Sequence, residues 1–211
     1  MRTLLPTAAC SVGCVSFTSA SIVTDRPLEQ GIRTALALLE RCGLRGAFGG
    51  GLAVVIWGQP RVTQDLDLFV QITPEQVASL LAEARALGLR ADEDEQTSAR
   101  ELLEGGFLRL HPPAGHAPIA LDLLRADGPL HLEALRRARP FQLGDLSVPV
   151  LAPEDLILLK LVSFRPKDTF DLEVVVQTSR HALDLDYLRG WADRIGLRTR
   201  LEAFIAPGPT D

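Results

Sequence analysis

Two aspartates, Asp65 and Asp67, stand at the beginning of an apolar segment at 66–71 that has the length of a β-strand. Because side chains alternate along a strand, both carboxylates are expected on the same face, with Leu66 and Leu68 on the other. Two neighbouring carboxylates repel each other unless a cation lies between them. Mg²⁺ commonly binds one or two carboxylates together with substrate phosphates. The pair therefore predicts a Mg²⁺ site, with Mn²⁺ as the alternative ion; the competing interpretation is an acidic strand end exposed to solvent.

A third carboxylate occurs in a similar setting. Asp122 lies inside the apolar segment Ile119–Leu124, where an acid is costly to bury without a charged partner. If this segment lies beside the first strand, Asp122 joins the pair as a catalytic and metal-binding acid. Three acids can hold two metal ions, one activating an attacking hydroxyl and the other the leaving pyrophosphate. The alternative is an acid at a strand edge that pairs with a neighbour such as Arg125.

A double glycine, Gly50-Gly51, lies between a predicted strand at 45–48 and a predicted helix at 52–57. Backbone amides at such a helix N-terminus can face phosphate groups without interference from side chains. Arg61, just before the acidic pair, adds a positive contact. A dinucleotide-binding turn is not indicated, because Val54 stands where G-x-G-x-x-G requires its last glycine, and no P-loop pattern occurs.

Three cations follow within eight residues near the C-terminal third of the chain: Lys160, Arg165 and Lys167. Their density predicts a phosphate clamp that binds the nucleotide. Asp168 and Asp171 are three residues apart and therefore share one helix face, where they are expected to orient these cations or contact an acceptor. The competing interpretation is a purely structural cluster of ion pairs.

The elements that must position these groups follow from the apolar periodicity and the Gly and Pro punctuation. Helices are expected at 28–41, 52–57, 74–87, 130–137, 153–163, 166–177 and 184–195, and strands at 45–48, 66–71, 106–110 and 118–124, with a hairpin at 141–150. This order predicts an α/β (α+β) fold, a mixed sheet of four or five strands flanked by helices. Four parts are expected, which are a disordered leader at 1–25, a core at 26–150, a helical C-terminal part at 151–205 and a tail at 206–211.

The composition limits the partners. The 211 residues carry a net charge of −5, which does not favour bulk DNA binding through phosphates. RNA held on a local basic patch is still allowed, and Arg136, Arg137 and Arg139 form such a run, although a solvated helix face is its commoner explanation. The three cysteines give no disulfide framework. No apolar run reaches the ~18 residues of a membrane span.

Taken together, Gly50-Gly51, Asp65-x-Asp67 and the later Asp122 resemble the signature of the polymerase-β-like nucleotidyltransferase superfamily. The stretches GGLAV, DLDLFV and PEDLILLKL, followed by R-x-KD-x-x-DL, are similar to the bacterial minimal nucleotidyltransferases and the AbiEii-type toxins. The resemblance covers 46–172. It implies that Asp65 and Asp67 are metal ligands and that Asp122 is the general base. One departure is that many members have Gly-Ser where this chain has Gly50-Gly51.

The resemblance implies a cytoplasmic enzyme that moves an NMP from an NTP to a hydroxyl and releases pyrophosphate. The acceptor is open between RNA, with a tRNA end as one case, protein and a small molecule. RNA or protein is favoured by the toxin-like stretches, which also imply an antitoxin partner. Two alternatives stand against this, a non-catalytic nucleotide sensor or binding module and a metal-dependent phosphohydrolase. Retention of all three acids argues against the first, and the lack of a histidine near them against the second.

Overall fold

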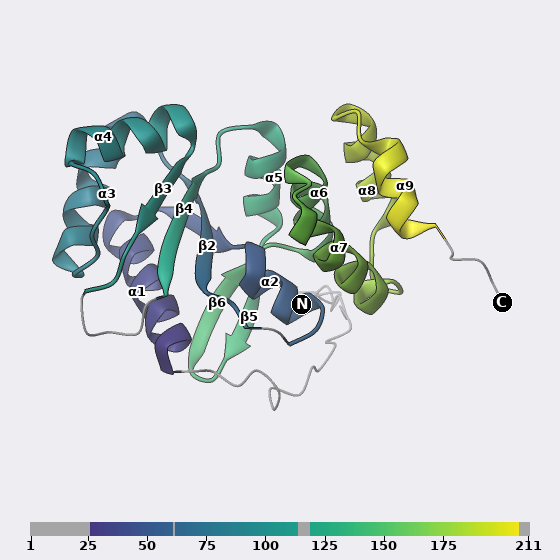
Figure 1. Cartoon of the computed structure of the whole chain (residues 1–211), viewed down its shortest axis with the longest axis horizontal. Helices are drawn as coiled ribbons and strands as arrows, with labels where there is room; N and C mark the ends of the chain where they lie inside the picture. The colour runs from purple at the N-terminus through teal and green to yellow at the C-terminus, as the bar shows by residue number, and fades with distance from the viewer. Residues whose placement is uncertain (1–25, 61, 114–118, 207–211) are drawn as a thin grey trace, which may run out of the picture.

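The computed structural model describes residues 26–60, 62–113 and 119–206. Within them, six strands form one mixed sheet in the order β3-β4-β2-β1-β6-β5 (Figure 1). The strands are β1 (Arg45–Phe48), β2 (Asp65–Gln71), β3 (Phe107–Leu110), β4 (Ala120–Arg125), β5 (Arg139–Leu143) and β6 (Leu146–Val150). The pairs β2–β4 and β1–β6 are parallel, and the other three pairs are antiparallel. The mixed sheet predicted from the sequence is confirmed.

Helices cover both faces of this sheet. On one face lie α1 (Arg26–Cys42) and α3 (Pro74–Ala86), and on the other lie α2 (Gly50–Trp57), α5 (Pro129–Arg137) and α6 (Pro153–Ser163). Side chains alternate between the two faces along β2. Leu66 and Leu68 are fully buried on the α1 side, where Leu66 lies next to Gly31 of α1. The odd-numbered residues of β2 consequently face the side of α2, α5 and α6.

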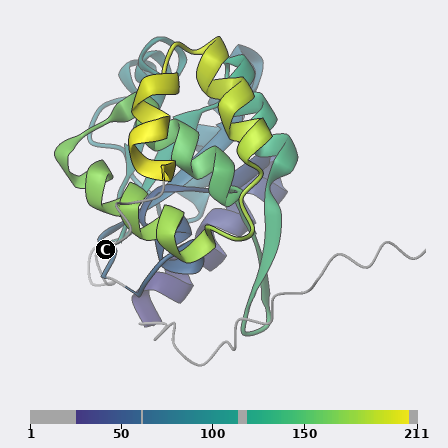
Figure 2. The same cartoon turned by 90° about the vertical axis from the view of Figure 1, so that its right-hand side faces the viewer.

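A second group of helices extends the structure beyond α6. These are α7 (Pro166–Ser179), α8 (Leu185–Arg194) and α9 (Arg198–Ile205), and Figure 2 shows them in front of the sheet when the molecule is turned. Buried residues of α6, α7, α8 and α9 belong to the same hydrophobic cluster as those of α1 and β2. The C-terminal helices therefore share one core with the sheet, and the division at 150/151 remains a proposal.

The structure differs from the expectation in the size of the sheet and in two helical segments. The hairpin β5–β6 joins the main sheet through β1, so the sheet has six strands instead of four or five. Where the sequence predicted no element, the structure has α4 (Glu95–Arg100), which Asp94 caps by accepting a hydrogen bond from the Thr97 amide, and a π-helical turn η1 (Glu101–Gly105) follows it. Helix α9 was not expected.

Several predictions fall outside the described residues, including the leader at 1–25 and all of the tail at 206–211 except Ala206. Among the helices that the structure describes, none is both long and apolar enough to cross a membrane.

Candidate active site

The acidic pair on β2 has the geometry that the alternation predicted. Asp65 and Asp67 lie on one face and are only partly exposed, while Leu66 and Leu68 between and after them are buried in the core. The parallel register of β2 and β4 places Asp67 directly opposite Asp122. Facing residues on neighbouring strands lie about 5 Å apart and share one face. The three carboxylates therefore gather on the α2–α5–α6 side of the sheet.

The double glycine meets this acid cluster at the beginning of α2. Gly50 has a φ of 47°, and a Cβ atom added there would lie 1.6 Å from Oδ2 of Asp67. The Gly49 amide donates to the backbone carbonyl of Asp67 at 2.9 Å, and the Gly51 amide hydrogen-bonds the Asp67 carboxylate. Only glycine fits at position 50, because both the left-handed φ and the approach of Asp67 exclude a side chain.

The charge of Asp67 is only partly compensated by its surroundings. Burial raises the pKa of the Asp67 carboxyl above its ordinary value, and the negative charges of Asp65 and Asp122 raise it further. The Gly51 amide and the positive charge of Lys167 oppose this rise. A nearby cation, supplied either by the protein or by a ligand, would therefore stabilise the ionised form of Asp67.

Arg109 supplies one protein cation. It lies on β3 opposite Asp122, and its Nε and Nη2 donate to the two carboxylate oxygens of Asp122 at 2.7 and 2.6 Å. The same Nη2 lies 3.4 Å from Oδ2 of Asp65. The hydrogen bonds that Arg109 donates to the Asp122 carboxylate raise the pKa of the Arg109 guanidinium. The partner of Asp122 is thus Arg109, and the alternative pairing with Arg125 is wrong, since Arg125 reaches Asp127 and the carbonyl of Leu103.

The donor set suits one divalent ion with oxygen ligands. Asp65 and Asp67 offer carboxylates on one face, which is the usual protein contribution to a Mg²⁺ site that also takes phosphate oxygens. Within the described residues, no three or more His, Cys, Asp or Glu side chains are grouped to hold a metal on their own. Asp65 and Asp67 would therefore hold the ion as two of its ligands, with water or the phosphates of a bound nucleotide at the remaining positions.

The predicted phosphate clamp contains a buried network of ion pairs. Lys160 Nζ donates to Oδ1 of Asp168 at 3.0 Å and to Oδ2 of Asp171 at 2.7 Å, and all three side chains are buried. Asp168 Oδ2 also accepts from Ser163 Oγ at 2.8 Å and from the Arg165 amide at 2.9 Å. The geometry is that of the structural ion-pair cluster, and it joins the end of α6 to the first turns of α7.

This network forms because α6 and α7 are separated by a sharp break. Phe164 ends α6 with a φ of 40°, Pro166 begins α7, and Arg200 of α9 stacks over the Phe164 ring at 4.2 Å. Burial opposes ionisation of Asp168, but the hydrogen bonds from the Arg165 amide and Lys160 outweigh it and lower the pKa to about 2. The break leaves Arg165 and Lys167 exposed beside the buried pairs.

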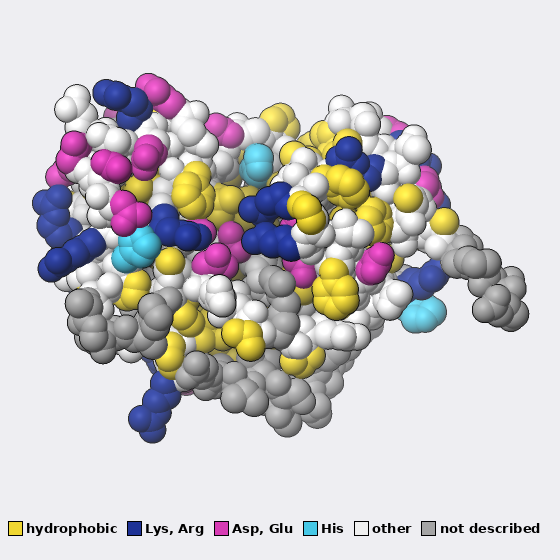
Figure 3. All heavy atoms as spheres, in the orientation of Figure 1, with side chains coloured by type: hydrophobic (Ala, Val, Ile, Leu, Met, Phe, Trp, Pro, Cys, Tyr) yellow, Lys and Arg dark blue, Asp and Glu magenta, His cyan; other side chains and the backbone are white. Residues whose placement is uncertain are grey.

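One cavity connects the acid cluster with this break. It has a volume of about 160 Å³, and Gly50 and Asp67 line it together with Lys160, Ser163 and Arg165. In the space-filling view, acidic side chains near the middle of the face, in the region of β2, are flanked by basic ones on both sides (Figure 3). The structure thus brings together residues that are about 100 positions apart in the sequence.

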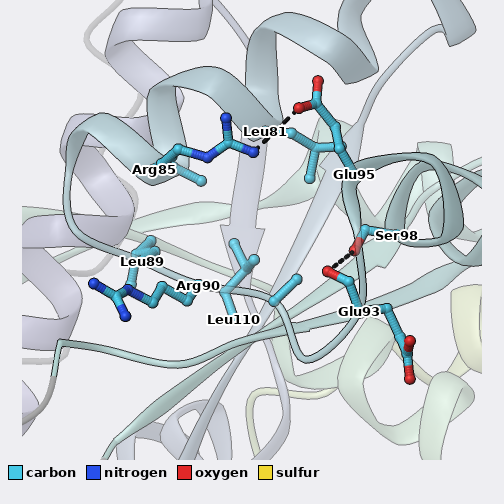
Figure 4. A pocket seen from close by; sticks show the side chains of 10 residues that line it. Leu81, Arg85, Leu89, Arg90, Glu93, Glu95, Ser98 and Leu110 are labelled. Carbon is cyan, nitrogen blue, oxygen red and sulfur yellow. Dashed lines mark hydrogen bonds and ion pairs between the residues drawn. The ribbon is translucent and has the colours of Figure 1, made fainter.

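A larger cavity of about 380 Å³ lies between α3, the segment 89–94 and α4, away from the predicted site residues (Figure 4). Among the polar groups that line it, Arg85 pairs with Glu95 at 3.1 Å, and Ser98 donates to the backbone carbonyl of Glu93 at 3.3 Å. The remaining wall is mostly apolar. Nothing in this lining matches phosphate-transfer chemistry, so the smaller cavity is the better candidate despite its size.

The sequence did not indicate two residues of the candidate site. Arg109 could have been found from the pattern Phe107-Leu108-Arg109-Leu110, had the pairing with Asp122 been known. His131 was not among the predicted site residues, but it is half-buried in the 160 Å³ cavity and stacks on Phe69 with ring centroids 6.0 Å apart. Burial lowers the pKa of His131.

Arg61 lies outside the described residues. Arg137 is not part of a solvated helix face, as it was interpreted, because it donates to Asp155 at 3.0 Å and Glu154 at 3.2 Å, both buried. Arg136 remains exposed and pairs with Glu133 on its own helix.

Comparison with known proteins identifies the family of the chain. Residues 38–206 match the family model described as nucleotidyl transferase AbiEii toxin, Type IV TA system. No curated protein sequence matches the chain.

Solved structures share the fold at low identity. The antibiotic-resistance factor ANT(2'')-Ia superposes with a TM-score of 0.54 at 18% identity, over 85% of this chain and 98% of the other. Its complex with adenylyl-2''-tobramycin gives 0.53 at 19% identity, over 82% and 97% of the two chains. An antigenic nucleotidyltransferase-like protein from Paracoccidioides brasiliensis gives 0.52 at 15% identity, over 86% and 93%.

The family match defines the class of protein as a nucleotidyltransferase, an enzyme that transfers an NMP group. Since the family model covers most of its length, the chain belongs to the AbiEii nucleotidyltransferase toxin family. Nucleotidyltransferases of this kind generally use divalent metal ions.

Proposed function

We propose that this chain is a cytoplasmic, Mg²⁺-dependent nucleotidyltransferase whose reaction takes place in the cavity between β2 and the α6–α7 break. The observation that carries the proposal is that Asp67 and Gly50 line the same cavity as Lys160 and Arg165. Carboxylates for a metal ion and cations for phosphates thus face one space, as NMP transfer from an NTP requires.

The triphosphate is proposed to lie between α2 and the α6–α7 break. The N-terminus of α2, at Gly50-Gly51, offers the positive end of a helix. Arg165 and Lys167 are exposed and supply positive charge for the phosphates. Arg61 is proposed to add a further positive contact. The ammonium of Lys160 also lines the cavity, but it shares its charge with Asp168 and Asp171, which hold it in place.

Asp65 and Asp67 are proposed to hold the Mg²⁺ ion, with Mn²⁺ as the alternative. The bound ion would neutralise charge on the phosphates as the α-phosphorus is attacked and pyrophosphate leaves. Asp122 is the third acid of the cluster. In its proposed role as general base, Asp122 would take the proton on a carboxylate oxygen that also accepts a hydrogen bond from Arg109, since each oxygen has a second acceptor site. Catalysis then depends mainly on positioning and charge compensation.

The acceptor is proposed to be a hydroxyl of RNA or protein, as expected of a toxin whose family belongs to a toxin–antitoxin system. An antitoxin protein is the corresponding partner. A small-molecule acceptor is the remaining class, since a structural neighbour carries its adenylyl group on tobramycin.

Transfer of label tests the proposal. The purified protein is incubated with each α-³²P-labelled NTP, Mg²⁺ and a cell extract, and compared with the variant Asp65→Ala/Asp67→Ala. We expect label to enter one acceptor with the wild type only, and pyrophosphate to be released. The variant Asp92→Ala/Asp186→Ala is the matched control, because it removes two exposed carboxylates outside the cavity.

The outcomes separate the acceptor classes. Label that is sensitive to ribonuclease identifies RNA, label that is sensitive to protease identifies protein, and label in the small-molecule fraction identifies the third class. Full transfer by Asp65→Ala/Asp67→Ala would overturn the proposed site. Release of inorganic phosphate without transfer would indicate a phosphohydrolase instead.

A further inference from the structure

Arg109 occupies a position that a second metal ion would need. Three carboxylates on one face can hold two divalent ions, provided that the third carboxylate is free to bind. Here the guanidinium forks over both oxygens of Asp122, at 2.7 and 2.6 Å, and reaches Asp65 at 3.4 Å. This paired geometry is the strongest that arginine makes with a carboxylate. Both carboxylate oxygens of Asp122 are therefore already paired with a cation, whose positive charge opposes the binding of a second ion at this carboxylate.

The charges lead to the same conclusion. When all are ionised, three carboxylates and one guanidinium leave two negative charges on this face, which one divalent cation compensates. Asp122 is also buried, with a relative exposure of 4%, so its charge needs a fixed partner in the free protein. Arg109 can pair with Asp122 and also compensate charge at Asp65 and Asp67, because it lies on β3 opposite Asp122 and beside the metal-binding pair.

We propose that Arg109 takes the place of the second metal ion, restricting the free protein to one divalent ion at Asp65 and Asp67 and fixing the Asp122 carboxylate. The inference rests on the proposed metal site, and it makes Arg109 a positioning residue rather than a catalytic one. Removing the guanidinium makes the net charge of the site more negative by one unit. It also removes the hydrogen bonds that the carboxylate oxygens of Asp122 accept from Arg109.

Mn²⁺ binding to the protein without nucleotide tests this inference, because free Mn²⁺ is counted directly by electron paramagnetic resonance. The wild type is expected to bind one Mn²⁺. Arg109→Met is expected to bind a second ion, or to bind the first at least about tenfold more tightly, since a unit charge is removed within a few ångströms of the site. Arg45→Met is the matched control, because Arg45 is exposed at the far end of β1 and makes no ion pair in the described residues.

Each outcome has a definite meaning. If Arg109→Met binds one Mn²⁺ with wild-type affinity, the inference is overturned while the metal site stands. If the wild type binds no Mn²⁺, or if Asp67→Asn binds it as well as the wild type does, the metal site itself is overturned. Should Arg109→Met not fold, Arg109→Lys carries the test. A lysine keeps the charge but cannot fork over both oxygens of Asp122. We then expect about threefold tighter binding, and unchanged binding would overturn the inference.

Discussion

Two charged clusters lie on opposite sides of one cavity, and they are built differently. At the α6–α7 break, the buried Lys160 pairs with the buried Asp168 and Asp171, and the exposed Arg165 also pairs with Asp168, so two cations face two carboxylates. On β2 and β4, three carboxylates face one guanidinium, and Asp65 and Asp67 are partly exposed. The first cluster is electrically complete without a ligand, whereas the second is not.

The difference teaches how charge can be divided between stability and function. A buried and fully paired cluster costs several kcal/mol when one partner is removed, because the remaining charge is then buried alone. A cluster with excess charge of one sign destabilises the fold slightly and gains from a bound cation. We therefore expect substitutions at the α6–α7 break to change stability first, and substitutions on β2 to change transfer first.

Among substitutions that remove no charged group, Gly50→Ala is expected to have the largest effect on transfer. The added methyl group would meet Asp67 Oδ2 at 1.6 Å, so Asp67 must leave its position although it is still present. We expect a loss of NMP transfer of about a thousandfold, which corresponds to about 4 kcal/mol of lost transition-state stabilisation. The measurement is the rate of label transfer from α-³²P-NTP.

Gly190→Ala is the control for this substitution, since a Cβ at Gly190 of α8 meets no heavy atom within 4 Å. The same chemical change is expected to leave transfer unchanged and to raise the free energy of unfolding by about 0.5–1 kcal/mol. Equal transfer rates for Gly50→Ala and Gly190→Ala would refute the packing of Asp67 against Gly50.

Lys160→Met is expected to have the largest effect on stability. It removes the cation that Asp168 and Asp171 share in the buried network. The expected loss is about 3–5 kcal/mol in the free energy of unfolding, measured by urea denaturation. Lys167→Met, at an exposed position two residues from Arg165, should change this quantity by less than about 0.5 kcal/mol. A comparable loss in both variants would contradict the difference between the buried and the exposed cation.

Ionised Asp168 is expected to make a smaller contribution to the free energy of unfolding, and acid unfolding can measure it. Asp168 has a pKa of about 2 against an ordinary value of 3.8. Because the folded pKa is lowered, ionised Asp168 stabilises the fold above pH 3.8, and this contribution is lost as the pH falls from about 4 to 2. The expected size is about 2 kcal/mol. Measured from pH 6 to pH 2, the unfolding free energy of Asp168→Asn should fall less steeply than that of the wild type. Parallel curves would show that Asp168 does not contribute in this way.

Local patterns were enough to predict most of the fold and part of the site. The alternation of side chains around Leu66 and the helix starts at Pro74 and Pro153 depend on neighbouring residues in the sequence. The structure agrees with these predictions. The pairing of Arg109 with Asp122 depends instead on which strands are neighbours, and the sequence does not state that order.

Burial explains why the environments of Lys160 and His131 differ from what the sequence indicated. Lys160 was predicted to contact phosphates because it lies near Arg165 and Lys167, but helix α7 folds its carboxylates onto the ammonium. His131 carried no motif, and only the packing of α5 on β2 brings it against Phe69. In each case a contact between distant segments decided the environment of a side chain, whereas composition and spacing describe local neighbours.

The most direct test applies the same substitution to both clusters, with transfer and unfolding measured on each protein at a temperature where both are folded. Asp67→Asn is expected to abolish NMP transfer while it retains or slightly raises the free energy of unfolding, because it relieves repulsion by Asp65 and Asp122. Asp168→Asn is expected to lower the free energy of unfolding by at least about 2 kcal/mol. If Asp67→Asn retained transfer and lost stability as Asp168→Asn does, the assignment of the reaction to the β2 acids would be contradicted.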